Sequence, residues 1–163
     1  MNPFTTRELK YITAILLCLF GVVSFNMSIS LRRGRDSIRK NDISALQKSL
    51  DTYYQKYRVY PLSTDDGKII GCFNEEVVRD KKSGYPLNVE TCIWGESKFE
   101  DNKLMPRDPT YKKGNSYKYI SDGKRYEIYI SLEGKDEAEY TPSIAAKYLQ
   151  CGTKICNYGR VQE

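Results

Sequence analysis

The chain has no histidine and only one tryptophan among its 163 residues. Without imidazole, it lacks the side chain that most often acts as a general base near neutral pH. It also lacks Ser-His and Cys-His nucleophile pairs and histidine-ligated metal sites. An enzyme would have to depend on carboxylate pairs or a reactive cysteine, and no motif places either. The sequence therefore favours a protein that is not an enzyme.

Charge is absent from residues 11–31, YITAILLCLFGVVSFNMSISL, although 29% of the whole chain is charged. A run of this length can cross a bilayer as one helix. A removed signal peptide has a shorter apolar run that is followed by a small-residue cleavage site, and Glu8 stands just before this run. We expect a short segment 1–10, a retained transmembrane helix 11–31, and membrane lipid as a partner.

The excess of positive charge is confined to one segment of the chain. Residues 1–31 carry a net charge of +1, residues 32–62 carry +5 and residues 63–163 carry −1. A nucleic-acid-binding domain would carry its cations on the folded part, so nucleic acid is not a favoured partner. The basic segment is more simply a collar at the lipid headgroups. By the positive-inside tendency, this collar would put the carboxyl-terminal side in the cytoplasm.

The cysteines indicate the opposite orientation. Cys18 lies within the apolar run, whereas the other four cysteines follow it. An even number in a small domain favours disulfides and an oxidising compartment. Of the three connectivities we prefer the adjacent one, which joins Cys72 to Cys92 and Cys151 to Cys156. A zinc site made of all four is the competing interpretation, but it prefers two short C-x2-4-C spacings. The domain after the helix is therefore expected outside the cytoplasm.

An apolar stripe continues beyond the uncharged run at intervals of three and four residues. It consists of Ile43, Leu46, Leu50, Tyr53 and Tyr57. This spacing is typical of an amphipathic helix that packs on a domain. No proline interrupts residues 4–60, so residues 4–57 could form one helix of about 80 Å. Its later part, in residues 32–60, is expected to be a stem that packs on the rest of the chain.

Residues 61–163 are expected to form a globular head. Residues 117–121 and 125–132 alternate apolar and polar side chains around Asp122 and Gly123, which is a strong hairpin signal. The apolar face of this hairpin packs most simply on the stem stripe. The sequence thus predicts an α+β fold in which a small antiparallel sheet is laid across a helix.

The connection between stem and hairpin is too long for a simple loop. Residues 62–110 should therefore hold a short helix or a strand pair, held by Cys72 and Cys92. Trp94 is expected to be a partly buried anchor of this region rather than a ligand platform. The fourteen tyrosines could form a recognition surface, but several lie on the stem or the strands and should pack there instead.

A series of short motifs runs along the chain in order. They are Phe4-Thr5-Thr6-Arg7-Glu8; the stem residues Asp36, Arg39, Asp42, Ile43, Leu46, Leu50 and Tyr54; Tyr60-Pro61; Pro106-Arg107-Asp108-Pro109; Tyr117-Lys118-Tyr119; and Tyr126 to Leu132. Together they resemble the type IV pilin-like proteins, and within that family the major pseudopilins of type II secretion. The resemblance implies a pilin-like fold, in which a long amino-terminal helix, half of it transmembrane, packs on a small antiparallel sheet.

The resemblance also implies a structural subunit that assembles with copies of itself or with other pilin-like subunits into a type IV pilus or a secretion pseudopilus. Phe4 would open the mature chain, but Pro3 precedes it where the family has glycine, so cleavage there stays open. Glu8 would neutralise the amino-terminal charge of a neighbouring subunit. Local pairing of Glu8 with Arg7 or Lys10 is the competing role.

The family's amino terminus is cytoplasmic and its head extracytoplasmic, which agrees with the cysteines and overrides the charge tendency. A single-pass membrane protein is therefore expected, with a cell-surface filament as one outcome. The competing functional hypothesis is a monomeric, membrane-tethered domain that captures surface glycans or DNA. No small-molecule substrate is expected.

Acidic residues follow the last expected strand of the head. They are Glu133, Asp136, Glu137 and Glu139. By resemblance, pseudopilins often hold calcium in a loop at this place, and Asp136 would be its first ligand here. The run lacks an EF-hand spacing, so a solvated acidic loop is the competing and preferred interpretation. No other cofactor is expected.

Overall fold

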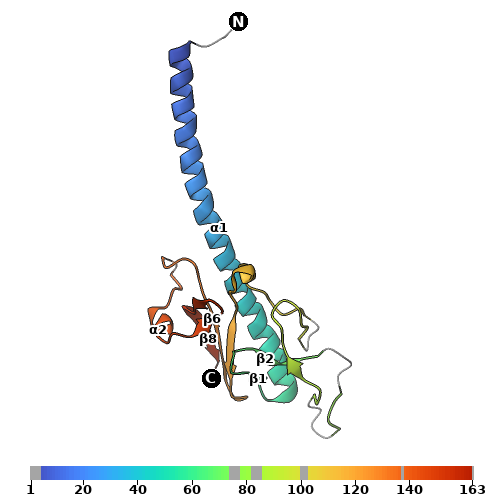
Figure 1. Cartoon of the computed structure of the whole chain (residues 1–163). Coiled ribbons are helices and arrows are strands. Elements are labelled where there is room, and N and C mark those ends of the chain that lie inside the picture. Colours follow the sequence, from blue (N-terminus) through green and yellow to red (C-terminus); the bar gives the residue numbers. More distant parts are fainter. Residues whose placement is uncertain (1–4, 74–77, 82–85, 100–102, 137, 163) are drawn as a thin grey trace. The chain divides into compact units, whose positions relative to one another are not determined.

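The computed structural model of the chain comprises two compact units that divide between Arg35 and Asp36. The residues that it describes are 5–73, 78–81, 86–99, 103–136 and 138–162. The amino-terminal unit holds the first part of the long helix α1 (Thr6–Tyr57), and the carboxyl-terminal unit holds the rest of α1 and every described strand. Figure 1 shows α1 in blue to green and the strands beside its green end.

Helix α1 is continuous because nothing in its sequence interrupts it. Neither Gly21 nor Gly34 breaks it, although each costs about 1 kcal/mol relative to alanine. The helix ends where Arg58 adopts a left-handed backbone with φ of 61°, a conformation that helix ends commonly use. Pro61 follows and cannot continue the helical hydrogen bonds. The long helix predicted from the sequence is therefore confirmed.

The region between α1 and the hairpin forms a three-stranded antiparallel sheet. Its strands are β1 (Leu62–Ser63), β2 (Ile69–Cys72) and β3 (Glu90–Thr91), in the order β1-β2-β3. The disulfide between Cys72 and Cys92 ties the end of β2 to the residue after β3, with a Cα separation of 5.1 Å. The sequence predicts a short helix or a strand pair for this region. The structure has strands here, three rather than two.

The second sheet is built on the predicted hairpin. Its strands are β4 (Lys118–Ser121), β5 (Tyr126–Ile130) and β8 (Tyr158–Gln162), in the order β4-β5-β8. The turn is shaped by Asp122, whose Oδ1 accepts the backbone N–H groups of Lys124 and Arg125 at 2.9 and 3.0 Å. Gly123 occupies the left-handed region with φ of 87°, which glycine tolerates most readily. Strand β8 then adds to the far side of β5.

Three short elements occupy the chain before β8. They are α2 (Pro142–Ala145), β6 (Gln150–Cys151) and β7 (Lys154–Ile155). The β6–β7 pair is antiparallel and is closed by the disulfide between Cys151 and Cys156. A single 3-10 turn, Tyr111–Lys113, precedes β4.

The core of the carboxyl-terminal unit lies between α1 and the two larger sheets. From α1 it takes the stripe side chains Ile43, Leu46, Leu50 and Tyr53, all buried. From β5 and its continuation it takes Tyr126, Ile128, Ile130 and Leu132, also buried. Tyr57 and Trp94 pack at the margin of this cluster, partly exposed. The predicted α+β architecture, with a small antiparallel sheet laid across a helix, is confirmed.

Candidate assembly site

The apolar run exposes its side chains around the helix in the amino-terminal unit. Leu17 is 67% exposed and Phe20 is 72% exposed. One helix in the described part of the chain, α1, is long and apolar enough to cross a membrane. Its uncharged residues 11–31 extend about 32 Å, which matches the hydrocarbon core of a bilayer. An apolar surface of this extent is suited to lipid or to other apolar helices rather than to water.

Glu8 caps the start of α1. Its Oε2 accepts the backbone N–H of Thr5 at 2.7 Å, and the Thr5 hydroxyl accepts the backbone N–H of Glu8 at 3.4 Å. This reciprocal pair is a capping box, and the spacing Thr5-x-x-Glu8 is typical of that motif. The hydrogen bond from the Thr5 backbone lowers the pKa of the Glu8 carboxyl. The assembly role of Glu8 stays a prediction, and Phe4 lies outside the described residues.

Arg39 is the centre of a buried charge cluster in the carboxyl-terminal unit. Its Nε and Nη2 donate to the two carboxylate oxygens of Asp108 at 2.7 and 3.1 Å. Its Nη1 donates to Asp36 at 2.7 Å and to Glu133 at 2.9 Å. Nη2 also donates to the hydroxyl of Thr110 at 2.8 Å. Arg39 and Asp36 are fully buried. Water does not reach these charges, so the opposite charges of the cluster must compensate them.

The same cluster fixes two loops to α1. Asp36 accepts the backbone N–H groups of Glu133 and Gly134, each at 2.9 Å. Asp108 accepts the backbone N–H of Thr110 at 2.6 Å. One turn of α1 therefore holds both the Asp108 turn and the loop that follows β5, with charge-assisted hydrogen bonds.

The contacts within the cluster shift the pKa values of Asp108 and Arg39 in opposite directions. Burial favours a higher pKa for Asp108, but the hydrogen bonds from Arg39 and Thr110 outweigh burial and lower it. Burial opposes the charge of Arg39, yet its bonds to the carboxylates raise its pKa. Both groups therefore stay charged at neutral pH, as the geometry requires.

Asp42 lies one turn further along α1, next to the cluster. It accepts a hydrogen bond from the hydroxyl of Tyr117. Burial raises the pKa of Asp42; the Tyr117 hydrogen bond lowers it, and the negative charge of Asp108 raises it again. The surroundings of Asp42 thus disfavour its ionised form.

The acidic loop after β5 mostly provides partners for cations of α1. The Glu133 carboxylate binds Arg39, and the Glu139 carboxylate binds Lys40 at 3.0 Å. Asp136 is exposed, and Glu137 lies outside the described residues. Within the described part of the chain, no three His, Cys, Asp or Glu side chains gather as a metal-binding group. The calcium ligand role of Asp136 stays a prediction.

The four cysteines after the apolar run form two disulfides. The structure joins Cys72 to Cys92 and Cys151 to Cys156, which is the adjacent pairing preferred from the sequence. Cys18 is a free thiol on the exposed surface of α1. With all four cysteines in disulfides, none is available as a zinc thiolate.

Sequence reasoning did not find the Arg39 cluster as a site. Asp36 and Arg39 entered only as part of a family motif, and the carboxylate partners of Arg39 outside α1 lie 69 and 94 residues further along the chain. The Asp108-Pro109 turn was one local signal that could have pointed to it. An arginine on the buried face of a predicted stem, three residues after an aspartate, is a further signal for a buried ion pair.

The architecture of the chain is typical of one class of proteins. A long amino-terminal helix that is apolar and exposed in its first part, and that carries a small antiparallel head on its second part, is the arrangement of the type IV pilin-like proteins. No protein-family model and no solved structure matches the chain.

One curated protein gives the family. The type II secretion system core protein G of Vibrio cholerae serotype O1 is 30% identical to this chain over 136 residues. The match covers 83% of this chain and 82% of the Vibrio protein. The chain therefore belongs to the family of type II secretion core protein G, the major pseudopilins.

Proposed function

We propose that the chain is a structural subunit of a type II secretion pseudopilus. It is held in a membrane by residues 11–31 until it assembles with copies of itself or with other pilin-like subunits. The observation that carries this proposal is the first part of α1, whose apolar side chains are exposed. Within a filament the same surface would be covered by neighbouring helices, and a head-to-tail contact that does not close would build a fibre. The relationship to a secretion core protein supports this role.

The head is proposed to lie outside the cytoplasm. Its two disulfides support this orientation, because structural disulfides persist in oxidising compartments. The basic residues that follow the span would then face the headgroups on the same side as the head. Catalysis forms no part of the proposal, and the family relationship to a structural protein supports that choice.

The proposal can be tested by crosslinking through the apolar helix. A photoreactive amino acid at Leu17 in the full chain, expressed in membranes, should give a regular ladder of multimers. Phe20→Arg places a guanidinium within the span at a cost of about 3 kcal/mol, so it should reduce both membrane retention and the ladder. Leu87→Arg is the matched control, because Leu87 is an exposed apolar residue of the carboxyl-terminal unit.

Two results would contradict the proposal. A soluble chain with no membrane association would exclude the anchor. A membrane-bound chain that stays monomeric at every expression level would exclude the filament, and would favour the membrane-tethered binding domain instead.

A further inference from the structure

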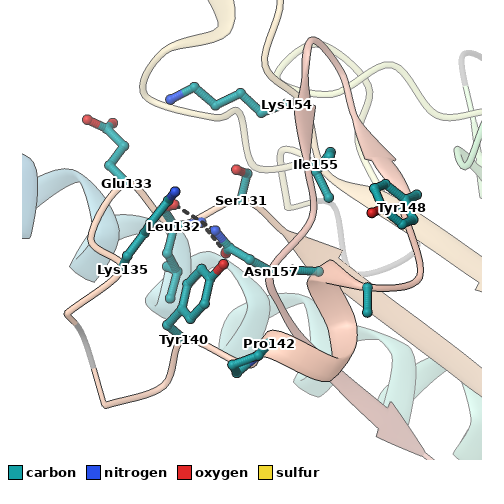
Figure 2. A pocket seen from close by; sticks show the side chains of 12 residues that line it. Ser131, Leu132, Glu133, Lys135, Tyr140, Pro142, Tyr148, Lys154, Ile155 and Asn157 are labelled. Atoms are coloured by element: carbon teal, nitrogen blue, oxygen red, sulfur yellow. Dashed lines mark hydrogen bonds between the residues drawn. The ribbon is translucent and has the colours of Figure 1, made fainter.

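A hollow of about 610 Å³ opens on the carboxyl-terminal unit between the end of β5, helix α2 and the β6–β7 hairpin. Leu132, Pro142 and Ile155 contribute apolar surface to it. Figure 2 shows Lys135 and Tyr140 on the loop side and Lys154 on the hairpin side. Its size falls within the range of ligand and peptide sites, and its mixture of apolar surface and a few polar groups is typical of them.

The charge of the hollow is positive. Three charged side chains line it: Glu133, Lys135 and Lys154. The Glu133 carboxylate binds Arg39 at 2.9 Å and is therefore already compensated. Both lysines are exposed and come from different elements, and among the described residues neither forms an ion pair. The hollow thus offers two ammonium groups beside an apolar surface, which complements an apolar side chain that is followed by acidic ones.

One segment of this same chain has that chemistry on its surface. Leu62 is 51% exposed, and Asp65 and Asp66 follow it on the exposed turn between β1 and β2. Hydrogen bonds between Thr64 and Lys68 hold the turn, with the Thr64 N–H donating to the Lys68 carbonyl at 2.9 Å. The segment is therefore pre-organised, which lowers the entropy cost of binding.

A second exposed acidic turn, at Asp122, is a poorer candidate. The Asp122 carboxylate accepts the backbone N–H groups of two residues of its own turn and lies 3.6 Å from the Arg125 guanidinium. It would have to leave these partners to bind a lysine elsewhere. No backbone N–H outside its own residue is recorded on the Asp66 carboxylate, which accepts a hydrogen bond from the Thr64 hydroxyl and pairs with Lys68. The Asp66 and Lys68 side chains are both more than 40% exposed. Such exposed pairs contribute little and exchange readily.

We propose that the hollow receives residues 62–66 of a second copy, with Leu62 on the apolar surface and the two aspartates at Lys135 and Lys154. The hollow and the segment belong to different sheets of one chain, so the contact is heterologous and repeats from copy to copy. The proposal rests on the proposed filament function and names the head contact within it. The apolar helices supply most of the stability, while the charges fix the register between neighbours.

The test uses charge reversal with rescue in the full chain in membranes. Ile155 is replaced by p-benzoylphenylalanine, and the photoadduct is mapped by mass spectrometry. The adduct should contain residues 62–66. Lys135→Glu with Lys154→Glu should reduce its yield about tenfold, because two attractions become repulsions. Asp65→Lys with Asp66→Lys should reduce it similarly.

A mixture of the two reversed chains, both carrying the photoreactive residue, should restore the adduct. Each hollow then meets a segment of opposite charge on the other variant. The matched control is Lys112→Glu with Lys113→Glu, two exposed lysines outside the hollow, which should leave the adduct unchanged. Protease resistance and intact disulfides of each variant show that it has folded.

The outcomes separate this contact from the filament itself. If crosslinks through Leu17 form but the Ile155 adduct maps elsewhere, or is not formed, or is unaffected by reversal, the contact is wrong and the filament stands. If the mixture does not restore the adduct, the charge pairing is wrong. If the Leu17 crosslinks are absent as well, both proposals fail together.

Discussion

Arg39 forms ion pairs with three carboxylates in the carboxyl-terminal unit. One guanidinium faces the carboxylates of Asp36, Asp108 and Glu133, and the shortest N–O distance to each lies between 2.7 and 2.9 Å. A buried ion pair adds little net stability when it is complete, because desolvation opposes the attraction. An incomplete one is costly, since the remaining charges are then buried without compensation. The cluster therefore acts by making any other packing of α1 on its loops unfavourable.

Removal of Arg39 should accordingly be severe. Arg39→Met keeps the length of the side chain but leaves the carboxylates without their cation, so the free energy of unfolding should fall by about 3–5 kcal/mol. Lys40→Met is the control, because it breaks the more exposed pair with Glu139, and such exposed pairs contribute less than about 1 kcal/mol. Urea unfolding of the full chain in detergent micelles, followed by fluorescence, measures both. Equal losses would contradict the central role of Arg39.

The pH dependence of stability should have two parts, one from Asp42 and one from Asp108. The pKa of Asp42 is raised on folding, so its ionised form destabilises the native state and acidification through that pKa relieves the penalty. The pKa of Asp108 is lowered on folding, so its contribution is present above the ordinary range of aspartate and is lost as the pH falls below it. Stability should therefore rise on mild acidification and fall at lower pH.

Asp42→Asn separates the two parts. The variant removes the titrating group but keeps an oxygen that can accept from Tyr117. The rise of stability on mild acidification should disappear, while the loss at lower pH should remain. Urea unfolding at a series of pH values measures this, and an Asp42→Asn profile parallel to that of the wild type would show that Asp42 is not the group responsible.

Among the elements, β8 depends most closely on a single backbone position. At Gly159, where β8 crosses opposite Tyr129, an added Cβ would lie 2.4 Å from the Tyr129 ring and 2.7 Å from the Ile128 carbonyl oxygen. The Ile128 carbonyl is part of the backbone of β5, and Tyr129 is fully buried, so neither can move away cheaply. The third strand of the sheet can approach β5 only because this residue has no side chain.

Gly159→Ala should therefore separate β8 from β5 and destabilise the chain by about 1–3 kcal/mol. Gly34→Ala is its matched control on α1, where an added Cβ meets nothing within 4 Å and should stabilise the helix by up to about 1 kcal/mol. The melting temperatures of the two variants should thus move in opposite directions. A neutral Gly159→Ala variant would show that the strand pairing tolerates displacement.

Elements with a long or distinctive pattern could be predicted from the sequence, and short ones could not. The helix α1 follows from a long uncharged run and a stripe of period 3.6, and the β4–β5 hairpin follows from alternation around Asp122 and Gly123. Strand β8 is as long as β5, but Tyr158–Gln162 contains glycine and shows no clear alternation, so it was missed. Its place is decided by pairing with β5, which is information about the tertiary structure.

At the scale of the whole molecule, the two units differ in how much apolar surface they bury within the chain. The carboxyl-terminal unit buries its own core and closes it with two disulfides. The described residues of the amino-terminal unit are almost all exposed, and its apolar window is not buried within the chain. In the proposed function, lipid and then neighbouring subunits would cover this surface, so the free energy of this part would depend on its surroundings.

The capping box bears on the assembly role predicted for Glu8. In the single chain the Glu8 carboxylate already holds the Thr5 backbone N–H. The carboxylate can accept more than one hydrogen bond, so in the predicted assembly role a neighbour's amino group would share it with the Thr5 N–H. The gain from that contact would then be smaller than for a carboxylate with no partner in its own chain.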